Sequence, residues 1–266
     1  MDSNLSNFGN AANPVAVSGD GSYTAFSTRF NEHYHSTRDG ALNESLQKHI
    51  VPALTHCTGR AEVTILDICY GLGFNTLGTL WYLRRHHCTT KVRIFSPEMD
   101  GDLIRSLRNF PYPEAFATLA PVIDAVSRRG CYRDEQIQIQ LYIGDARDYL
   151  KQCRERFDIV YQDAFSPSTN PLLWTGEYFS DMAKVIKREG ILTTYSTALK
   201  TRLALYENGF NVYLNKGEGF RNATVASKME LEGFEKVDME HKRGCNPDVK
   251  PLRDGQFLDG FSSKES

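Results

Sequence analysis

Two neighbouring segments of the sequence end in residues that could bind a nucleoside. Gly71 and Gly73 follow the apolar run that contains Asp67, and glycines at such a point let a tight turn bring its backbone close to a ligand. Glu98 ends the next apolar run, where a carboxylate can accept both hydrogen bonds of a ribose diol. The two endings together favour a nucleoside site over a plain turn.

Two further apolar runs end in aspartates. Asp145 stands in Gly-Asp-Ala, where its carboxylate can accept a hydrogen bond from the amino group of an adenine base. Asp163 follows a later run and is expected to face the reacting end of the ligand. Because ligands of open parallel sheets bind beyond the carboxyl ends of the strands, we expect both aspartates to share one cavity with Gly71 and Glu98.

The glycine loop excludes two common nucleotide sites. Thr76 stands where a dinucleotide-binding loop needs its third glycine, and no Gly-Lys-Ser or Gly-Lys-Thr follows as in a P-loop. A nucleoside without a pyrophosphate remains, and S-adenosyl-L-methionine fits this description. We expect its adenosine at Glu98 and Asp145, and its methionine part near Gly71 and Gly73.

The composition is that of an ordinary globular protein. Of its 266 residues 41% are hydrophobic and 24% are charged, with a formal net charge of −2, so an RNA partner would need a local basic patch. The sequence shows neither a membrane-spanning apolar run nor a signal-peptide pattern, which predicts a soluble, cytoplasmic protein with no membrane partner. The six cysteines include no Cys-X-X-Cys pair, so we expect reduced thiols and no metal site.

Strands alternate with helices through the middle of the chain and must position these residues. Apolar strand patterns recur at residues 62–69, 91–98, 137–145, 156–164 and 190–196. Helical patterns separate them, for example at residues 76–87, 176–189 and 197–209. This alternation predicts an α/β fold with a doubly wound, mostly parallel sheet. A closing strand pair at residues 211–215 and 223–227 could be antiparallel.

The ends of the chain have different patterns. Residues 23–34 fit one or two short strands and residues 40–54 a helix, which together form an N-terminal extension, while residues 109–133 suggest an inserted helix pair or lid. We expect a flexible leader over residues 1–22 and a main domain over residues 23–230. The charged tail over residues 231–266 either wraps the domain or stays mobile.

The segment from Asp163 to Thr175, DAFSPSTNPLLWT, resembles the D-[AG]-F-[AS]-P-x-x-N-P-x-[LM]-W-T motif of the MnmC-like methyltransferases. The similarity extends over roughly residues 25–228. That family methylates the aminomethyl group on the wobble uridine, position 34, of certain tRNAs. The resemblance implies a class I S-adenosyl-L-methionine-dependent methyltransferase (Rossmann-like) fold, S-adenosyl-L-methionine as cofactor, and Asp163 as the catalytic carboxylate beside the reacting amine.

Further site residues match the family's motifs. The resemblance adds four to the cofactor site, besides Asp163 itself: Tyr34, Ser36, Glu44 and Asn75. On the substrate side it adds Pro167, Asn170 and Arg221. Phe165, Trp174 and Tyr195 are candidate walls for a splayed-out uridine, with a core position as the alternative. We favour a wall role for Trp174 because it lies in a proline-rich loop.

The sequence also departs from the family pattern. Cys69 replaces the usual first glycine of the cofactor loop, which leaves the loop usable if its backbone dihedral angles are ordinary. Arg221-Asn222 stands where the family often has a basic pair. Many relatives carry a fused flavin-dependent oxidase, but few residues follow Lys228 and no second GxGxxG is present. We therefore expect no FAD, no oxidase activity and a substrate that already carries a free aminomethyl group.

The expected partner is the anticodon stem-loop of tRNA, and the oligomeric state stays open. Candidate phosphate contacts are Arg84, Arg85, Lys200, Arg202, Lys216 and Arg221. Two alternatives remain. A polyamine aminopropyltransferase would share the sheet and a nucleosidyl sulfonium donor, and a non-catalytic tRNA-binding module would keep the fold without the chemistry.

Overall fold

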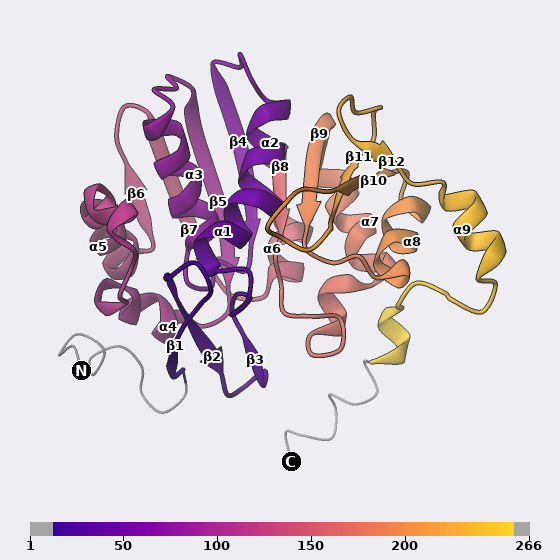
Figure 1. The fold of residues 1–266 in the computed structure, drawn as a ribbon, viewed down its shortest axis with the longest axis horizontal. Helices are drawn as coiled ribbons and strands as arrows, with labels where there is room; N and C mark the ends of the chain where they lie inside the picture. Colours follow the sequence, from indigo (N-terminus) through magenta and orange to yellow (C-terminus); the bar gives the residue numbers. More distant parts are fainter. Residues whose placement is uncertain (1–12, 258–266) are drawn as a thin grey trace.

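The computed structural model describes residues 13–257, and its centre is a nine-stranded sheet with the order β12-β10-β11-β9-β8-β4-β5-β7-β6 (Figure 1). Five neighbouring strands are parallel: β9 (Ile186–Thr194), β8 (Phe157–Gln162), β4 (Glu62–Ile68), β5 (Lys91–Glu98) and β7 (Ile137–Ile143). Four antiparallel strands complete the edges: β10 (Asn211–Asn215), β11 (Ala223–Ser227), β12 (Glu235–Lys236) and β6 (Cys131–Arg133). The predicted α/β class, the mostly parallel sheet and the antiparallel closing pair are confirmed.

The strand order reverses beside β4. The chain runs outward from β4 through β5 to β7 and then returns to the other side of β4 as β8 and β9. The loops that follow β4 and β8 lead to helices on opposite faces of the sheet, which leaves a crevice at the carboxyl ends of these two strands. Ligands of such sheets bind in this crevice.

Helices cover both faces of the sheet. One face carries α1 (Ala41–Ser45), α2 (Val51–His56), α3 (Phe74–Arg85), α4 (Gly101–Ser106) and α5 (Ala120–Arg129). The other carries α6 (Ala146–Gln152), α7 (Gly176–Val185) and α8 (Leu199–Glu207). Short helical turns lie at Leu46–Ile50, Leu107–Asn109, Glu114–Leu119, Pro171–Trp174 and Asp254–Gln256.

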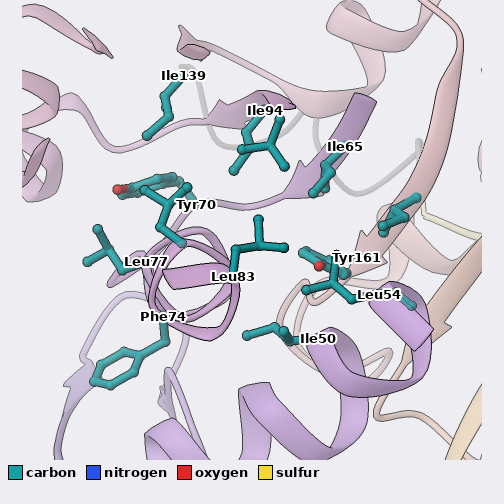
Figure 2. Packing of buried hydrophobic residues seen from close by; sticks show 14 of the residues in the cluster. Ile50, Leu54, Ile65, Tyr70, Phe74, Leu77, Leu83, Ile94, Ile139 and Tyr161 are labelled. Carbon is teal, nitrogen blue, oxygen red and sulfur yellow. The ribbon is translucent and has the colours of Figure 1, made fainter. Parts of the chain in front are cut away.

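Neighbouring residues of each central strand supply the two core layers. In β4, Ile65 packs into one hydrophobic cluster and Leu66 into the other, because side chains alternate across a strand. Figure 2 shows the first cluster, in which Ile65 and Ile94 from the sheet lie above Leu77 and Leu83 of α3. Burial on both faces explains why these strands read as continuous apolar runs.

The N-terminal extension forms a small sheet of its own. β1 (Val15–Val17), β2 (Tyr23–Ser27) and β3 (Glu32–His33) pair antiparallel, below the ends of the parallel strands in Figure 1. β1 lies inside the expected leader, of which residues 1–12 are outside the described part of the chain. The helix predicted over residues 40–54 consists of α1, one turn of π-helix at Leu46–Ile50, and α2.

Residues beyond 230 contribute to the central sheet. β12 pairs with β10, and α9 (Met239–Cys245) packs beside α8. Farther on, Leu252 bridges to Thr175, and its carbonyl accepts a hydrogen bond from Gly176 N–H at 2.9 Å. Residues 258–266 of the expected tail lie outside the described residues. Within residues 13–257, no helix has the length and apolar character needed to cross a membrane.

Candidate active site

A cavity of about 850 Å³ opens at the carboxyl ends of the parallel strands. Its lining includes Gly71, Glu98, Asp145 and Asp163, one from each of the four strand endings. The expectation that these endings share one cavity is therefore met. The small N-terminal sheet supplies the opposite wall with residues of β2, β3 and the turn between them.

Glu98 and the glycine loop form one end of this cavity. The Glu98 carboxylate is buried and accepts hydrogen bonds from Gly71 N–H at 2.9 Å and from Asp100 N–H at 2.8 Å. Burial raises the pKa of Glu98, and these backbone bonds oppose that rise. Because a carboxylate has about four acceptor positions, capacity for a diol remains.

The two glycines of the loop have different roles. Gly71 lines the cavity with φ +53°, and a Cβ atom there would stand 3.2 Å from the Tyr34 ring. Gly73 was expected at the cofactor, but it does not line the cavity. It caps the start of α3 with φ +78°, and a Cβ atom at this position would collide with the Tyr70 ring at 2.8 Å. Gly73 thus shapes the loop from behind.

Cys69 has a left-handed backbone conformation with φ +64° and lines the cavity. We expected the replacement of glycine by Cys69 to leave the loop usable if the backbone dihedral angles were ordinary. This φ value is not ordinary for a residue with a side chain. A side chain in this region costs on the order of 1 kcal/mol relative to glycine, so the loop keeps its shape at a price in stability.

Asp145 caps the helix that follows its strand. Its Oδ1 accepts a hydrogen bond from Arg147 N–H at 2.7 Å, which orients the carboxylate at the start of α6. The Arg147 side chain also lines the cavity and is held by Asp254 at 3.0 Å. The segment beyond residue 250 therefore fixes one wall of the site.

Asp163 lies at the floor of the cavity between two polar side chains. Asn75 Nδ2 donates to its Oδ2 at 2.8 Å, and His49 Nε2 lies 3.4 Å from its Oδ1. Burial alone would raise the pKa of Asp163, but the neighbouring His49 and His35 and the Asn75 amide lower it below its usual range. Asp163 is therefore ionised at neutral pH.

Asp67 lies behind Asp163 and is in the opposite protonation state. It is fully buried, and burial raises its pKa to about 8, against the opposing hydrogen bond from Thr76 Oγ1 at 2.8 Å. Asn75 Nδ2 also stands 3.4 Å from Asp67 Oδ1. The floor thus contains one charged and one neutral carboxyl, and the negative charge is concentrated on Asp163.

A cluster of ion pairs holds three further expected site residues, Ser36, Glu44 and Arg221. Glu44 Oε2 accepts from Ser36 N–H at 2.6 Å, and Lys48 Nζ donates to Glu44 Oε1 at 2.7 Å and to Asp39 Oδ2 at 2.9 Å. Arg221 approaches Asp39 at 3.3 Å. Tyr34, Ser36, Glu44 and Arg221 all line the cavity. The sequence analysis missed Lys48, although the Glu44–Lys48 spacing on one helix face was visible.

The aromatic residues divide between the rim and the core. The Phe165 ring stacks on Phe30 with centroids 4.7 Å apart, and Tyr195 and Asn170 also line the cavity. The expected wall role of Trp174 is wrong in this structure, because its side chain is fully buried and Nε1 donates to the Phe165 carbonyl at 2.7 Å. Pro167 is half-buried beside the rim but does not line the cavity.

Of the basic residues expected to contact phosphate, Arg221 lines the cavity and the others do not. Arg84 donates to the Thr118 carbonyl at 3.1 Å, and Arg202 donates to Thr224 Oγ1 at 3.0 Å. Two exposed arginines that the sequence analysis missed, Arg29 and Arg38, line the mouth instead.

Known proteins resemble this chain in both sequence and fold. Residues 115–230 match the model of an S-adenosyl-L-methionine-dependent methyltransferase family. With the sheet described above, this match defines the class: the chain is a class I S-adenosyl-L-methionine-dependent methyltransferase. The crystal structure of MnmC2 from Aquifex aeolicus is similar with a TM-score of 0.80 and 31% identity, over 92% of this chain and 79% of that one. The chain therefore belongs to the MnmC-like methyltransferase family.

Curated relatives extend the comparison. The tRNA 5-methylaminomethyl-2-thiouridine biosynthesis bifunctional protein MnmC of Azoarcus sp. (strain BH72) is 31% identical over 78% of this chain. An uncharacterized protein of Methanocaldococcus jannaschii, MJ0670, is 29% identical over 79% of it. The chain spans 34% of the length of the first protein and 58% of the second.

The residues of the cavity fit the family's cofactor, S-adenosyl-L-methionine. A cavity of about 850 Å³ is within the usual range for small-molecule sites. Glu98 is available to the ribose, Asp145 to the adenine, and the bare backbone of Gly71 to a close approach. The individual contacts remain predictions.

Proposed function

We propose that the protein methylates the 5-aminomethyl group of the wobble uridine at position 34 of tRNA, giving 5-methylaminomethyl-(2-thio)uridine. The observation that carries this proposal is the Asp163 carboxylate at the floor of the cavity, where Asn75 holds it at 2.8 Å. The names of the MnmC relatives, which include tRNA 5-methylaminomethyl-2-thiouridine biosynthesis, support the same substrate. We infer a cytoplasmic location from this substrate.

The reaction needs a partner for positive charge. When bound, S-adenosyl-L-methionine supplies a methyl group activated by its sulfonium. Positive charge develops on the attacking nitrogen as the methyl group transfers, and an oriented carboxylate stabilises that charge without reorganising. Asp163 is held by Asn75, so its carboxylate accepts a hydrogen bond from the amine and directs the amine lone pair toward the methyl group.

The rim residues suit a single-stranded base. Phe165 and Phe30 present aromatic surface at the mouth, and unpaired RNA bases are commonly bound by stacking on such rings. Arg29, Arg38 and Arg221 lie around the same mouth, where their guanidinium groups can meet the phosphates of an anticodon stem-loop. The proposed substrate therefore enters over the small N-terminal sheet.

The test is mass spectrometry of wobble nucleosides. The protein is incubated with S-adenosyl-L-methionine and tRNA bearing 5-aminomethyl-2-thiouridine, and the tRNA is then digested. We expect the wobble nucleoside to gain one methyl group, whereas tRNA bearing the carboxymethylaminomethyl precursor stays unchanged, because the proposed reaction has no oxidase step and no FAD. If the cofactor binds and neither tRNA is methylated, the proposed function is wrong. Aminopropyl transfer from decarboxylated cofactor to putrescine would support the polyamine alternative.

A further inference from the structure

His49 is a buried residue of the active site that the mechanism above does not use. It lies in the π-helical turn Leu46–Ile50, a rare backbone form that is frequent at functional sites. Its side chain is fully buried, and its ring meets Tyr161 edge to face with centroids 5.9 Å apart. Packing therefore fixes the ring plane.

Both ring nitrogens of His49 face polar atoms of the core. Nδ1 lies 3.0 Å from Thr193 Oγ1 in β9. Nε2 lies 3.4 Å from Asp163 Oδ1 and makes no hydrogen bond within the described chain. A separation of 3.4 Å is longer than a formed N–H···O bond, and bonds of this kind commonly shorten when substrate binds.

The chemistry of these neighbours selects one tautomer. A neutral imidazole carries one donor and one acceptor, and an ionised carboxylate can only accept. The proton therefore belongs on Nε2, facing Asp163. Nδ1 then accepts a hydrogen bond from the Thr193 hydroxyl, which can donate. In this arrangement Nε2–H faces one oxygen of Asp163, and the remaining lone pairs of the carboxylate stay available to the amine.

We propose that His49 is a positioning residue for methyl transfer: the Thr193 hydroxyl hydrogen-bonds Nδ1 and holds the ring in place, and Nε2–H holds one oxygen of Asp163. Asn75 holds the other oxygen at 2.8 Å. Two donors behind the carboxylate fix its plane and direct its remaining lone pairs into the cavity. This inference rests on the proposed function, since it assigns Asp163 to the amine.

The first test compares two threonine substitutions. Thr193→Val removes the hydroxyl but keeps the shape, and we expect kcat to fall about tenfold, the effect of losing one orienting hydrogen bond, with an unchanged KM for S-adenosyl-L-methionine. Thr64→Val is the matched control, because Thr64 is also a buried threonine of the central sheet, whereas it is the Thr193 hydroxyl that contacts His49 Nδ1. Equal kcat values for the two variants would overturn the proposal.

The second test asks whether His49 acts through Asp163. We expect His49→Gln, which keeps a donor near Nε2 but loses the link to Thr193, to lower kcat less than His49→Leu. In an Asp163→Asn background, neither change should lower kcat further, because residues that act as a unit are not additive. If the His49 substitutions lowered kcat in the Asp163→Asn background as much as in the wild type, His49 would have a structural role only.

A third measurement needs no tRNA. Nitrogen NMR of histidine-labelled protein should show His49 protonated at Nε2 in the wild type, and the Nδ1 resonance should shift in Thr193→Val because its hydrogen bond is lost. A wild-type proton on Nδ1 would overturn the proposal. If the wild type carries the Nε2 proton yet methylates no tRNA, the proposed function fails while the Thr193–His49 contact stands.

Discussion

Asp163 at the floor of the cavity and Phe165 at its rim are separated in the chain by Ala164 alone, yet their surroundings are opposite. The Asp163 side chain is 10% exposed and lies between Asn75 and His49. Phe165 is partly exposed and contacts Phe30, which lies in the turn between β2 and β3 of the separate N-terminal sheet. The floor therefore holds a preset charge, whereas the rim presents aromatic surface on which an incoming base can stack.

This difference predicts where substitutions act. Changes at the floor should lower kcat or cofactor affinity, because the electrostatic arrangement there exists before substrate binds. Changes at the rim should raise the KM for tRNA and leave the chemical step in place. The predictions that follow test this division.

The largest effect is expected at Asp163. Asp163→Asn keeps the shape and the contact with Asn75 but removes the charge, so kcat should fall by a factor of about 10² to 10⁴. Because the shape and this contact are kept, calorimetry should find a cofactor affinity within about twofold of the wild-type value. A change of twofold is smaller than the effect of losing one hydrogen bond. An unchanged kcat would show that Asp163 takes no part in methyl transfer. The proposed difference between the floor and the rim would then be wrong.

Glu98→Gln should act on the cofactor and not on the chemical step. One oxygen of Glu98 would become an amide that cannot accept from Gly71 or Asp100 N–H, and a ribose hydroxyl would lose a charged acceptor. We expect cofactor affinity to fall about tenfold or more, measured by calorimetry, with kcat nearly unchanged at saturating cofactor. Unaltered affinity would show that Glu98 does not bind the ribose.

Phe165→Leu tests the rim. Loss of an aromatic stacking surface should raise the KM for tRNA by about fivefold or more at a similar kcat, in line with the energy of stacking one base. Tyr82→Leu is the control, because Tyr82 is a partly exposed aromatic residue of α3 that does not line the cavity. A fall in kcat with no change in KM would place Phe165 functionally with the floor.

Asp67→Asn should give the smallest effect, on stability. Burial raises the pKa of Asp67 to about 8 in the folded protein, while the unfolded chain keeps a value of about 3.9. Between these values the unfolded state binds fewer protons, so stability falls as pH rises from about 4 to about 8. Asparagine removes this titration. At about 1.4 kcal/mol per pH unit, we expect the wild-type Tm to drop a few degrees more than that of the variant between pH 6 and pH 7, measured by calorimetry.

The sequence predicted the floor better than the rim. Gly71, Glu98, Asp145 and Asp163 were found because apolar strand patterns locate strand ends, and parallel strand ends meet at one edge. Trp174 was misplaced because a proline-rich loop suggested exposure. Its indole N–H bonds to the Phe165 carbonyl, which lets the ring be buried without an unpaired donor.

Other site residues left no local pattern to find. His49 meets Asp163 and Thr193 across the fold, and a single histidine in a helical pattern carries no information about such distant partners. Phe30 joins the rim because the small N-terminal sheet packs beneath the strand ends, an arrangement that hydrophobic periodicity does not encode. The contact of Asp254 with Arg147 likewise depends on where the last described residues dock.

The most direct test of the central claim is a crystal structure with S-adenosyl-L-homocysteine bound. The account predicts ribose hydroxyls on Glu98, the adenine beside Asp145, and the sulfur turned toward the Asp163 carboxylate. A ligand whose ribose lies away from Glu98, or whose sulfur points away from Asp163, would contradict it.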